Sequence, residues 1–174
     1  MKTIPSSDFT VRINELWNNR WLLLTSGNYE MNSFNTMAVA WGYFGIMWNK
    51  PMAVVVVQPG RFTFEFMEKY KTFTLTAFSE EYKKDLLLMG SLSGRDMDKI
   101  TGSDLTPVAS SVVSAPAYKE AELIVECRKV YWDDFKPENF VDLSIENNYP
   151  KKDYHRMYFG EVVHISGIEN YADE

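Results

Sequence analysis

Apolar positions recur along the chain with the two-residue period of β-strands or in short unbroken runs. The stretches with these patterns are 21–26, 37–41, 52–57, 73–78, 121–131 and 157–168. The run 52–57 contains four valines and is too short for a helix, which predicts a strand buried on both faces. In the stretch 121–131, apolar residues such as Leu123 alternate with Glu126 and Arg128, which predicts a strand with one solvated face.

Three segments carry helical signals instead. Between residues 63 and 70, apolar side chains fall at helical spacing. Ser79 is a suitable helix N-cap followed by two glutamates, and the segment 82–89 continues as a helix that Gly90 can end. A further short helix is expected over 93–99.

The other segments carry turn signals, and the aromatic segment 43–51 is predicted to be a loop. No internal repeat and no Pro/Gly/Ser-rich linker divides the chain, so residues 1–174 are predicted to form one domain. About six strands with a few short inserted helices favour a mainly β barrel or sandwich over an alternating β-α-β fold.

Composition narrows the classes of function. The chain has 18 basic and 24 acidic residues, and the resulting net charge of −6 argues against a nucleic-acid partner. The single cysteine, Cys127, excludes an intrachain disulfide and a cysteine-built metal cluster. The first residues lack the apolar core of a signal peptide, and no apolar run approaches the roughly 20 residues that span a bilayer. These features predict a soluble cytoplasmic protein with no membrane partner and no metal site.

The first candidate binding segment is Gln58-Pro-Gly-Arg61-Phe-Thr63, directly after the valine-rich run. A strand, a glycine-containing turn and a helix start in succession offer unpaired N–H groups to an anion. Arg61 can hold phosphate oxygens in a two-pronged contact, and Thr63 can donate its hydroxyl. A capped helix beside a surface arginine explains the same residues without a ligand.

A second Gly/Ser-rich turn begins at Gly90 and leads into the helix expected over 93–99. Arg95 and Lys99 stand four residues apart, so a helix would place both on one face, where they could make further phosphate contacts. A simple connection between two helices, with neighbouring aspartates balancing the charge, is the alternative.

Two more segments carry groups that suit a ring-shaped ligand. Residues 35–41 combine an amide, a hydroxyl and small side chains, so a flat polar heterocycle can approach the backbone beside Trp41. A core strand with a buried tryptophan is the alternative. His155, just ahead of the last strand, is either a proton donor or hydrogen-bonding group near a ligand, or a histidine satisfied within the fold.

Taken in order, these segments resemble the flavin reductase-like family, which includes the flavoredoxins and has an FMN-binding split-barrel fold. The matching segments are 35–42, the strand after Pro51, 61–63, 93–99, 105–107, 115–116, 126–127 and 154–162. They cover about residues 20–168. The sequence departs from the family pattern at Gln58, where many members have a basic residue, and at Phe62, where tyrosine is frequent.

The resemblance implies a mainly β, FMN-binding split β-barrel of about six strands that forms a homodimer with FMN near the subunit interface. It implies that the isoalloxazine ring lies along Asn35, Thr36, Met37, Ala38 and Trp41. It implies that the phosphate and ribityl chain are held by Arg61, Thr63, Ser93, Gly94 and Lys99. His155 is the catalytic candidate, positioned to hydrogen-bond the ring or an incoming nicotinamide.

The implied activity is that of an NAD(P)H:flavin oxidoreductase, in which a hydride passes from the nicotinamide to flavin N5. Two alternatives remain open at this point. One is a flavoredoxin-like electron carrier served by a redox protein partner without direct NAD(P)H turnover. The other is a non-redox flavin-binding domain. The sequence also does not determine whether the bound flavin is FMN or FAD, whether the donor is NADH or NADPH, or what the final electron acceptor is.

Overall fold

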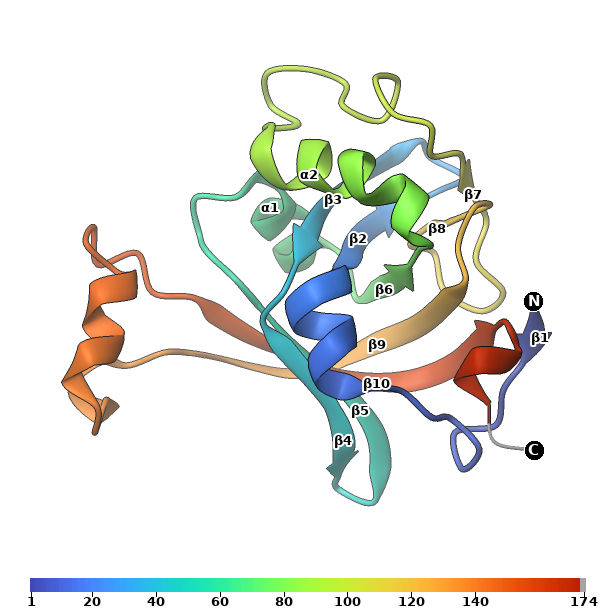
Figure 1. Ribbon diagram of the computed structural model, residues 1–174. Helices are drawn as coiled ribbons and strands as arrows, with labels where there is room; N and C mark the ends of the chain where they lie inside the picture. Colours follow the sequence, from blue (N-terminus) through green and yellow to red (C-terminus); the bar gives the residue numbers. More distant parts are fainter. Residues whose placement is uncertain (173–174) are drawn as a thin grey trace.

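One antiparallel sheet of eight strands dominates the computed structural model, which describes residues 1–172 (Figure 1). The strand order is β3-β2-β6-β9-β10-β5-β4, and β1 pairs with β10. The bounds are β1 Lys2–Thr3, β2 Leu22–Asn28, β3 Ser33–Val39, β4 Gly42–Met47, β5 Lys50–Val57, β6 Thr72–Ala77, β9 Leu123–Asp134 and β10 Arg156–Gly167. The strands β7 (Pro107–Val108) and β8 (Ala117–Tyr118) form a separate two-stranded ribbon.

Short helices occupy the connections between strands. The helix α1 (Phe62–Lys69) follows β5, and α2 (Lys83–Ser91) follows β6; both contact β2 and β3 (Figure 1). The π-helical turn η1 and the 3₁₀ turns η2 to η5 are Glu15–Arg20, Glu80–Tyr82, Pro137–Asn139, Leu143–Asn148 and Glu169–Tyr171. Among the described residues, no helix has the length and apolar character needed to cross a membrane.

The predicted two-sided burial of the valine-rich run is confirmed in β5. Val55 and Val57 belong to the main core inside the curved sheet, and Met52 and Val54 pack with Phe159 on the other side. Every residue from 52 to 57 is buried. Apolar side chains therefore stabilise this strand on both faces, as a continuous apolar run indicates.

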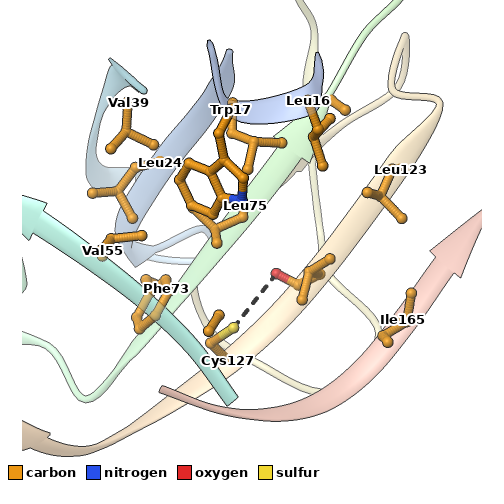
Figure 2. Packing of buried hydrophobic residues seen from close by; sticks show 14 of the residues in the cluster. Leu16, Trp17, Leu24, Val39, Val55, Phe73, Leu75, Leu123, Cys127 and Ile165 are labelled. Atoms are coloured by element: carbon orange, nitrogen blue, oxygen red, sulfur yellow. Dashed lines mark hydrogen bonds between the residues drawn. The ribbon is translucent and has the colours of Figure 1, made fainter. Parts of the chain in front are cut away.

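The main core lies within the curve of the sheet, where side chains from η1 meet those of the strands (Figure 2). Trp17 of η1 is 4% exposed and packs over the sheet. A Cβ atom on Gly42 would lie 2.5 Å from the Trp17 ring, so only glycine allows β4 to pass this close. Cys127 is fully buried in the same core, as expected for a small apolar side chain, and burial raises its pKa well above the ordinary value.

The prediction of a loop over 43–51 is wrong. Residues 42–47 form β4, which pairs with β5 in a tight hairpin. The connecting residues Trp48 and Asn49 have φ of 54° and 55°, the conformation of a type I′ hairpin turn. The turn was not recognised because Trp48 occupies a position that is usually Gly, Asn or Asp.

The helix predicted over 93–99 is also wrong, because this segment is an irregular turn. Its polar side chains bond the local backbone in place of a helical ladder. The Arg95 N–H donates to the Ser93 hydroxyl (3.2 Å), and the Ile100 N–H donates to Asp98 (3.1 Å). The prediction of an anion site at the start of a helix is therefore wrong for this segment. Ser93, Gly94 and Lys99 nevertheless line the candidate site described below.

The solvated face predicted for β9 is wrong at Glu126, which is 1% exposed. Its carboxylate accepts hydrogen bonds from the N–H groups of Ser111, Val112 and Val113 at 2.7, 2.8 and 3.1 Å. A buried carboxylate is tolerated when its oxygens are satisfied in this way. The loop before β8 covers this part of the strand, and the alternation of the strand cannot reveal such a cover.

The strands β9 and β10, twelve residues each, extend beyond the core and carry residues 135–155 away from it, here called the arm (Figure 1, orange). Aromatic rings hold the arm together, with Phe140 stacked on Tyr149 at 6.1 Å between centroids and Tyr154 at 4.9 Å from Tyr149. These contacts give a segment outside the main core its own small apolar cluster.

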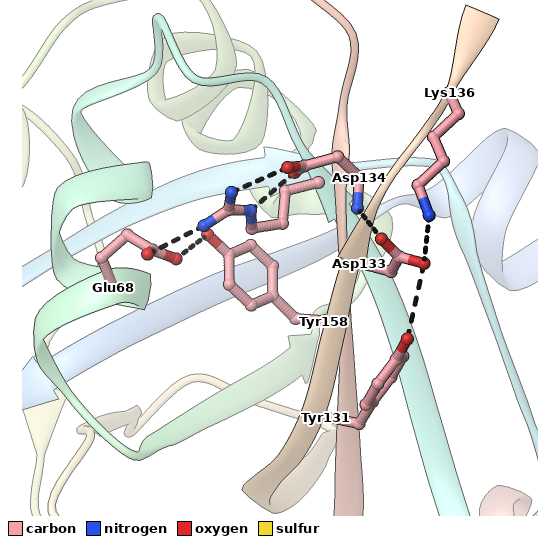
Figure 3. A network of polar contacts seen from close by, with 7 residues as sticks. Glu68, Tyr131, Asp133, Asp134, Lys136 and Tyr158 are labelled. Atoms are coloured by element: carbon pink, nitrogen blue, oxygen red, sulfur yellow. Dashed lines mark hydrogen bonds and ion pairs between the residues drawn. The ribbon is translucent and has the colours of Figure 1, made fainter. Parts of the chain in front are cut away.

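An ionic network fixes the base of the arm to α1 (Figure 3). Arg156 donates to both carboxylate oxygens of Asp134, at 2.6 and 2.8 Å, and to Glu68 of α1 at 2.9 Å. The Arg156 guanidinium also lies 3.7 Å from the centroid of the Trp132 ring. The hydrogen bond from Arg156 holds the pKa of Asp134 below its usual range. This network sets the position of the residue immediately before Arg156, which is His155.

Candidate functional site

Three adjoining cavities share Arg61 and together form the candidate site. The inner cavity, ≈ 130 Å³, lies between β3, the start of α1 and the segment after α2. The outer cavity, ≈ 280 Å³, lies between the end of β3, Gln58 and the arm. The side cavity, ≈ 300 Å³, runs along α2 beside Trp21. Ligand pockets are typically about 300–1,000 Å³, a range that the three cavities reach together.

Neutral polar groups line the inner cavity where β3 meets α1. The Asn35 amide lies 2.7 Å from the Thr63 hydroxyl, and with its oxygen toward α1 it also accepts from the Thr63 N–H at 3.2 Å. Asn35 therefore satisfies one of the free N–H groups at the start of α1. A Cβ on Gly94 would lie 2.3 Å from Asn35 Oδ1, so glycine is required for this close approach.

Lys99 supplies a buried positive charge to the inner cavity. It is 4% exposed, and its Nζ donates to the carbonyls of Met89 (2.9 Å) and Leu92 (3.2 Å) at the end of α2. Burial lowers the pKa of Lys99 to about 8, and the charge of Arg61 contributes to the decrease. The ammonium has a third N–H, so an anion in the cavity can gain a charge-assisted hydrogen bond.

Arg61 stands where the three cavities meet, just ahead of α1. Its guanidinium donates to the carbonyl of Gly90 at 3.0 Å, which directs it across the gap between α1 and α2. Arg95 has a different role, because it is paired with Glu65 and donates to the Gly60 carbonyl at 3.0 Å. Arg95 is absent from the lining of all three cavities.

The outer cavity has a flat and largely uncharged wall. Trp41 is 48% exposed, and the centroid of its ring lies 5.0 Å from that of His155. Gln58 and Asn148 add two amides to the same lining. Arg61 is the one cation among these lining residues. The two ends of the site therefore differ in charge and in shape.

His155 is neutral at physiological pH. Burial lowers its pKa to about 4, the Asp153 carboxylate opposes this decrease, and the charge of Arg61 adds to it. The Tyr149 hydroxyl lies 3.0 Å from Nδ1 of the imidazole. His155 can therefore offer a hydrogen bond, but it holds no second proton to give away near pH 7.

The structure brings most of the predicted site residues together. Asn35, Met37, Ala38, Trp41, Arg61, Thr63, Ser93, Gly94, Lys99 and His155 all line one or more of the three cavities. Thr36 does not, because its side chain points away from the main core toward Thr25, where it donates to the Leu24 carbonyl at 3.1 Å and lies 2.9 Å from the Thr25 hydroxyl. Alternation along β3 puts Thr36 on the face opposite its two neighbours.

Several lining residues lie outside the sequence prediction. Met89 and Leu92 provide the carbonyls that hold Lys99, and Asn148 comes from the arm. Any residue type has a main-chain carbonyl, so the sequence cannot show which carbonyls will hold Lys99. Asn148 was missed because it is distant in sequence from most of the other lining residues. Gln58 could have been predicted to line the site, because it departs from the family pattern and lies in the candidate binding segment 58–63.

Two larger cavities, ≈ 350 and ≈ 400 Å³, border the N-terminal segment. The first is lined largely by apolar side chains such as Phe9 and Phe44. The second contains Arg20, whose charge is already paired with Glu122 at 2.5 Å. Neither cavity combines free polar groups with a flat aromatic wall. Residues 1–172 also contain no group of three His, Cys, Asp or Glu side chains that could hold a metal ion.

Comparison with known proteins gives one family model and several solved structures that are similar to this chain. The model of the family described as "Flavin reductase like domain" matches residues 22–174. The flavoredoxin of Desulfovibrio vulgaris is similar in structure, with 19% identity, a TM-score of 0.67, and coverage of 98% of this chain and 78% of that one. An FMN-binding protein from Thermus thermophilus has 18% identity and a TM-score of 0.66, covering 99% and 84%. The NADH:FAD oxidoreductase of Streptomyces globisporus has 14% identity and a TM-score of 0.63, covering 87% and 77%.

These similarities confirm the predicted mainly β split-barrel fold, although the main sheet has eight strands where about six were expected. The added strands include the short β1 and β4, which forms the hairpin with β5.

Proposed function

The chain belongs to the family of flavin reductase like domains, and on that premise we propose that it binds FMN and acts as an NAD(P)H-dependent flavin oxidoreductase. One observation supports this proposal above all. A narrow inner end with buried and exposed cations joins a flat, largely uncharged outer end at Arg61. FMN has the same two-part character, with a phosphate at one end and a planar ring at the other.

The inner cavity fits a phosphate in charge and in available donors. Arg61 and Lys99 supply two cations and the Ser93 hydroxyl supplies a neutral donor, whereas the Thr63 hydroxyl donates to Asn35. Gly94 keeps the backbone close to Asn35, where any larger residue would fill the space. A phosphate is stabilised most by charge-assisted hydrogen bonds of this kind.

The outer end fits a flat ring. Met37 and Ala38 of β3 would lie along one side of the isoalloxazine, and Trp41 would border it. When bound, FMN supplies the chemistry by accepting a hydride from the nicotinamide at its N5 position. The residues of this chain bind and orient the two partners and keep water away, and His155 holds a neutral hydrogen-bond donor at the open side.

Two alternative functions for the same fold predict different experimental results. A flavoredoxin-like carrier would bind FMN and take electrons from a redox protein, and a non-redox domain would bind flavin without turnover. Purified protein is first titrated with FMN and with FAD by calorimetry and visible spectroscopy. Failure to bind either flavin would contradict the proposal.

The FMN-loaded protein is then mixed anaerobically with NADH or NADPH. Rapid bleaching of the flavin absorbance is the expected result. A yellow protein that is bleached only by a reduced redox protein is a carrier, and one that neither donor bleaches is a non-redox domain.

We also propose that the protein is a homodimer. The side chains of Trp48 and Tyr131 are about half exposed on the outer face of the sheet, beside Phe159, and their rings lie 6.1 Å apart. Clustered exposed aromatic side chains favour a two-fold interface. Light scattering is expected to give twice the 20.2 kDa mass of the chain, and a monomeric mass at micromolar concentration would contradict the proposal.

A further inference from the structure

Within residues 1–172, Tyr149 of the arm is the one side chain that hydrogen-bonds the imidazole of His155. Its hydroxyl lies 3.0 Å from Nδ1, and the side chain is 2% exposed. Phe140 stacks on its ring, and Tyr154 packs against it. The Tyr149 hydroxyl is thus held at Nδ1 by a cluster of rings, none of which lines the three cavities.

Counting protons determines which nitrogen of His155 carries the hydrogen. Burial raises the pKa of Tyr149, so its hydroxyl keeps its proton, and within residues 1–172 the one hydrogen-bond partner of this hydroxyl is Nδ1 of His155. If Nδ1 also carried a proton, the buried hydroxyl proton would have no acceptor. If Nδ1 is bare, the hydroxyl donates to it and both groups are satisfied. The imidazole proton then lies on Nε2.

The second ring nitrogen, Nε2, is left open, and His155 lines the outer cavity. His155 lines that cavity beside Trp41, and Nε2 makes no hydrogen bond to any described residue. Among residues 1–172, the fully buried polar side-chain atoms without a partner are Trp17 Nε1 and Thr76 Oγ1, so Nε2 is not sealed inside the protein. The charged groups that face the ring are Asp153 and Arg61.

We propose that Tyr149 is a positioning residue that fixes His155 as a neutral Nε2–H donor aimed at a carbonyl oxygen in the outer cavity. The part of this inference that concerns the ligand, here called the ligand half, rests on the proposed function. The acceptor is a ring carbonyl of the flavin or the carboxamide oxygen of the nicotinamide, which share the same chemistry. The amides of Gln58 and Asn148 line the same cavity and suit an uncharged polar ligand.

The tautomer is measured without any flavin. The chain has two histidines, so the long-range ¹H–¹⁵N spectrum of labelled protein at pH 7 contains two imidazoles, and His164→Gln identifies that of His155. Wild-type protein is expected to show His155 as a single form with the proton on Nε2. A proton on Nδ1, or a mixture of the two forms, would overturn the inference. This result does not depend on whether the protein binds FMN.

Two variants test the role of the hydroxyl. Tyr149→Phe is expected to give a mixture of tautomers, because Nδ1 has lost its donor. Tyr154→Phe removes a hydroxyl from the same arm that bonds Glu146 at 3.0 Å, and it should leave the spectrum of His155 unchanged. An unchanged spectrum in Tyr149→Phe would contradict the inference. The wild-type spectrum alone decides the matter if that variant does not fold.

The source of the carbonyl oxygen is found by titration. A shift of the His155 Nε2 resonance on addition of FMN alone identifies a flavin oxygen, and a shift that requires NAD⁺ as well identifies the carboxamide. Tyr149→Phe should then slow flavin reduction about 3- to 10-fold with unchanged affinity for FMN. Bound FMN with no shift under either condition would refute the ligand half, whereas absence of FMN binding would refute the proposed function instead.

Discussion

The inner and outer ends of the site are built in different ways. Residues within the segments 35–37, 60–63 and 89–99 form the inner end, where β3 contacts α1 and α2, and they include two cations. The outer end combines the end of β3 with His155 and Asn148, which the long β9–β10 hairpin brings from the arm. The inner end is suited to holding a charge. The outer end is suited to positioning an uncharged ring, and this difference is open to test.

Removal of Arg61 is expected to have the largest effect. Arg61→Ala deletes a charge-assisted contact and should weaken FMN binding about 10- to 150-fold, as measured by calorimetry. Riboflavin, which lacks the phosphate, should lose little affinity. Arg95→Ala is the matched control, because Arg95 is close in space but paired with Glu65 and outside the cavities. Equal losses for both ligands would show that Arg61 supports the fold instead.

Removal of His155 tests the outer end. His155→Ala should retain FMN but slow its reduction by NADH about tenfold, since one orienting hydrogen bond is lost. In the wild type the rate should be independent of pH between about 5.5 and 7.5, because the His155 pKa of about 4 lies below this range. Stopped-flow kinetics measures both quantities. A wild-type rate in the folded variant, or a kinetic pKa near 6.5, would contradict the assignment.

Lys99 should make FMN binding depend on pH. Its pKa of about 8 means that the free protein loses this charge between pH 7 and 9, while the phosphate stays fully ionised. Binding at pH 9 must then take up a proton, so FMN affinity is expected to fall by several-fold and at most about tenfold. Riboflavin and the Lys99→Met variant should show no such decrease. A flat FMN profile in the wild type would place Lys99 away from the phosphate.

The smallest expected effect is on stability in mild acid. The folded pKa of His155, about 4, is below its unfolded value, so the unfolded chain takes up a proton first as the pH falls. The His155 contribution to stability is therefore complete above about pH 6.5 and decreases from there toward pH 4. Urea midpoints of the wild type should decline between pH 6.5 and 5, above the range of most carboxyl groups. His155→Gln should decline less over the same range, and identical slopes would contradict the low pKa.

The sequence was most informative where local chemistry determines local structure. The valine run of β5 and the helical spacing of α1 predicted the observed elements, and a helix formed where it was expected after Ser79. The capping details were wrong, because Ser79 makes no side-chain cap and α2 continues through Gly90 to Ser91. The hairpin of β4 was missed because tertiary contacts stabilise two positive φ angles at Trp48 and Asn49. Glu126 was misread because the loop that buries it lies about fifteen residues earlier and carries no sign of that role.

In the candidate site, too, the sequence was informative where neighbouring residues determine the structure. The inner end could be predicted because strand, turn and helix start are adjacent in the sequence, although the helix expected over 93–99 did not form. The outer end could be predicted only in part. Nothing near Tyr149 or Asn148 in the sequence indicates that the arm returns them to the end of β3, since that depends on the length and pairing of β9 and β10.

The central claim is that the inner end recognises a phosphate and the outer end a ring. Calorimetric titration of the wild-type protein with FMN and with riboflavin, under the same conditions at pH 7, tests it most directly. Two cations at the inner end predict that FMN binds about 100-fold more tightly, or better. Equal affinities for the two flavins would show that the phosphate is not recognised and would contradict the claim.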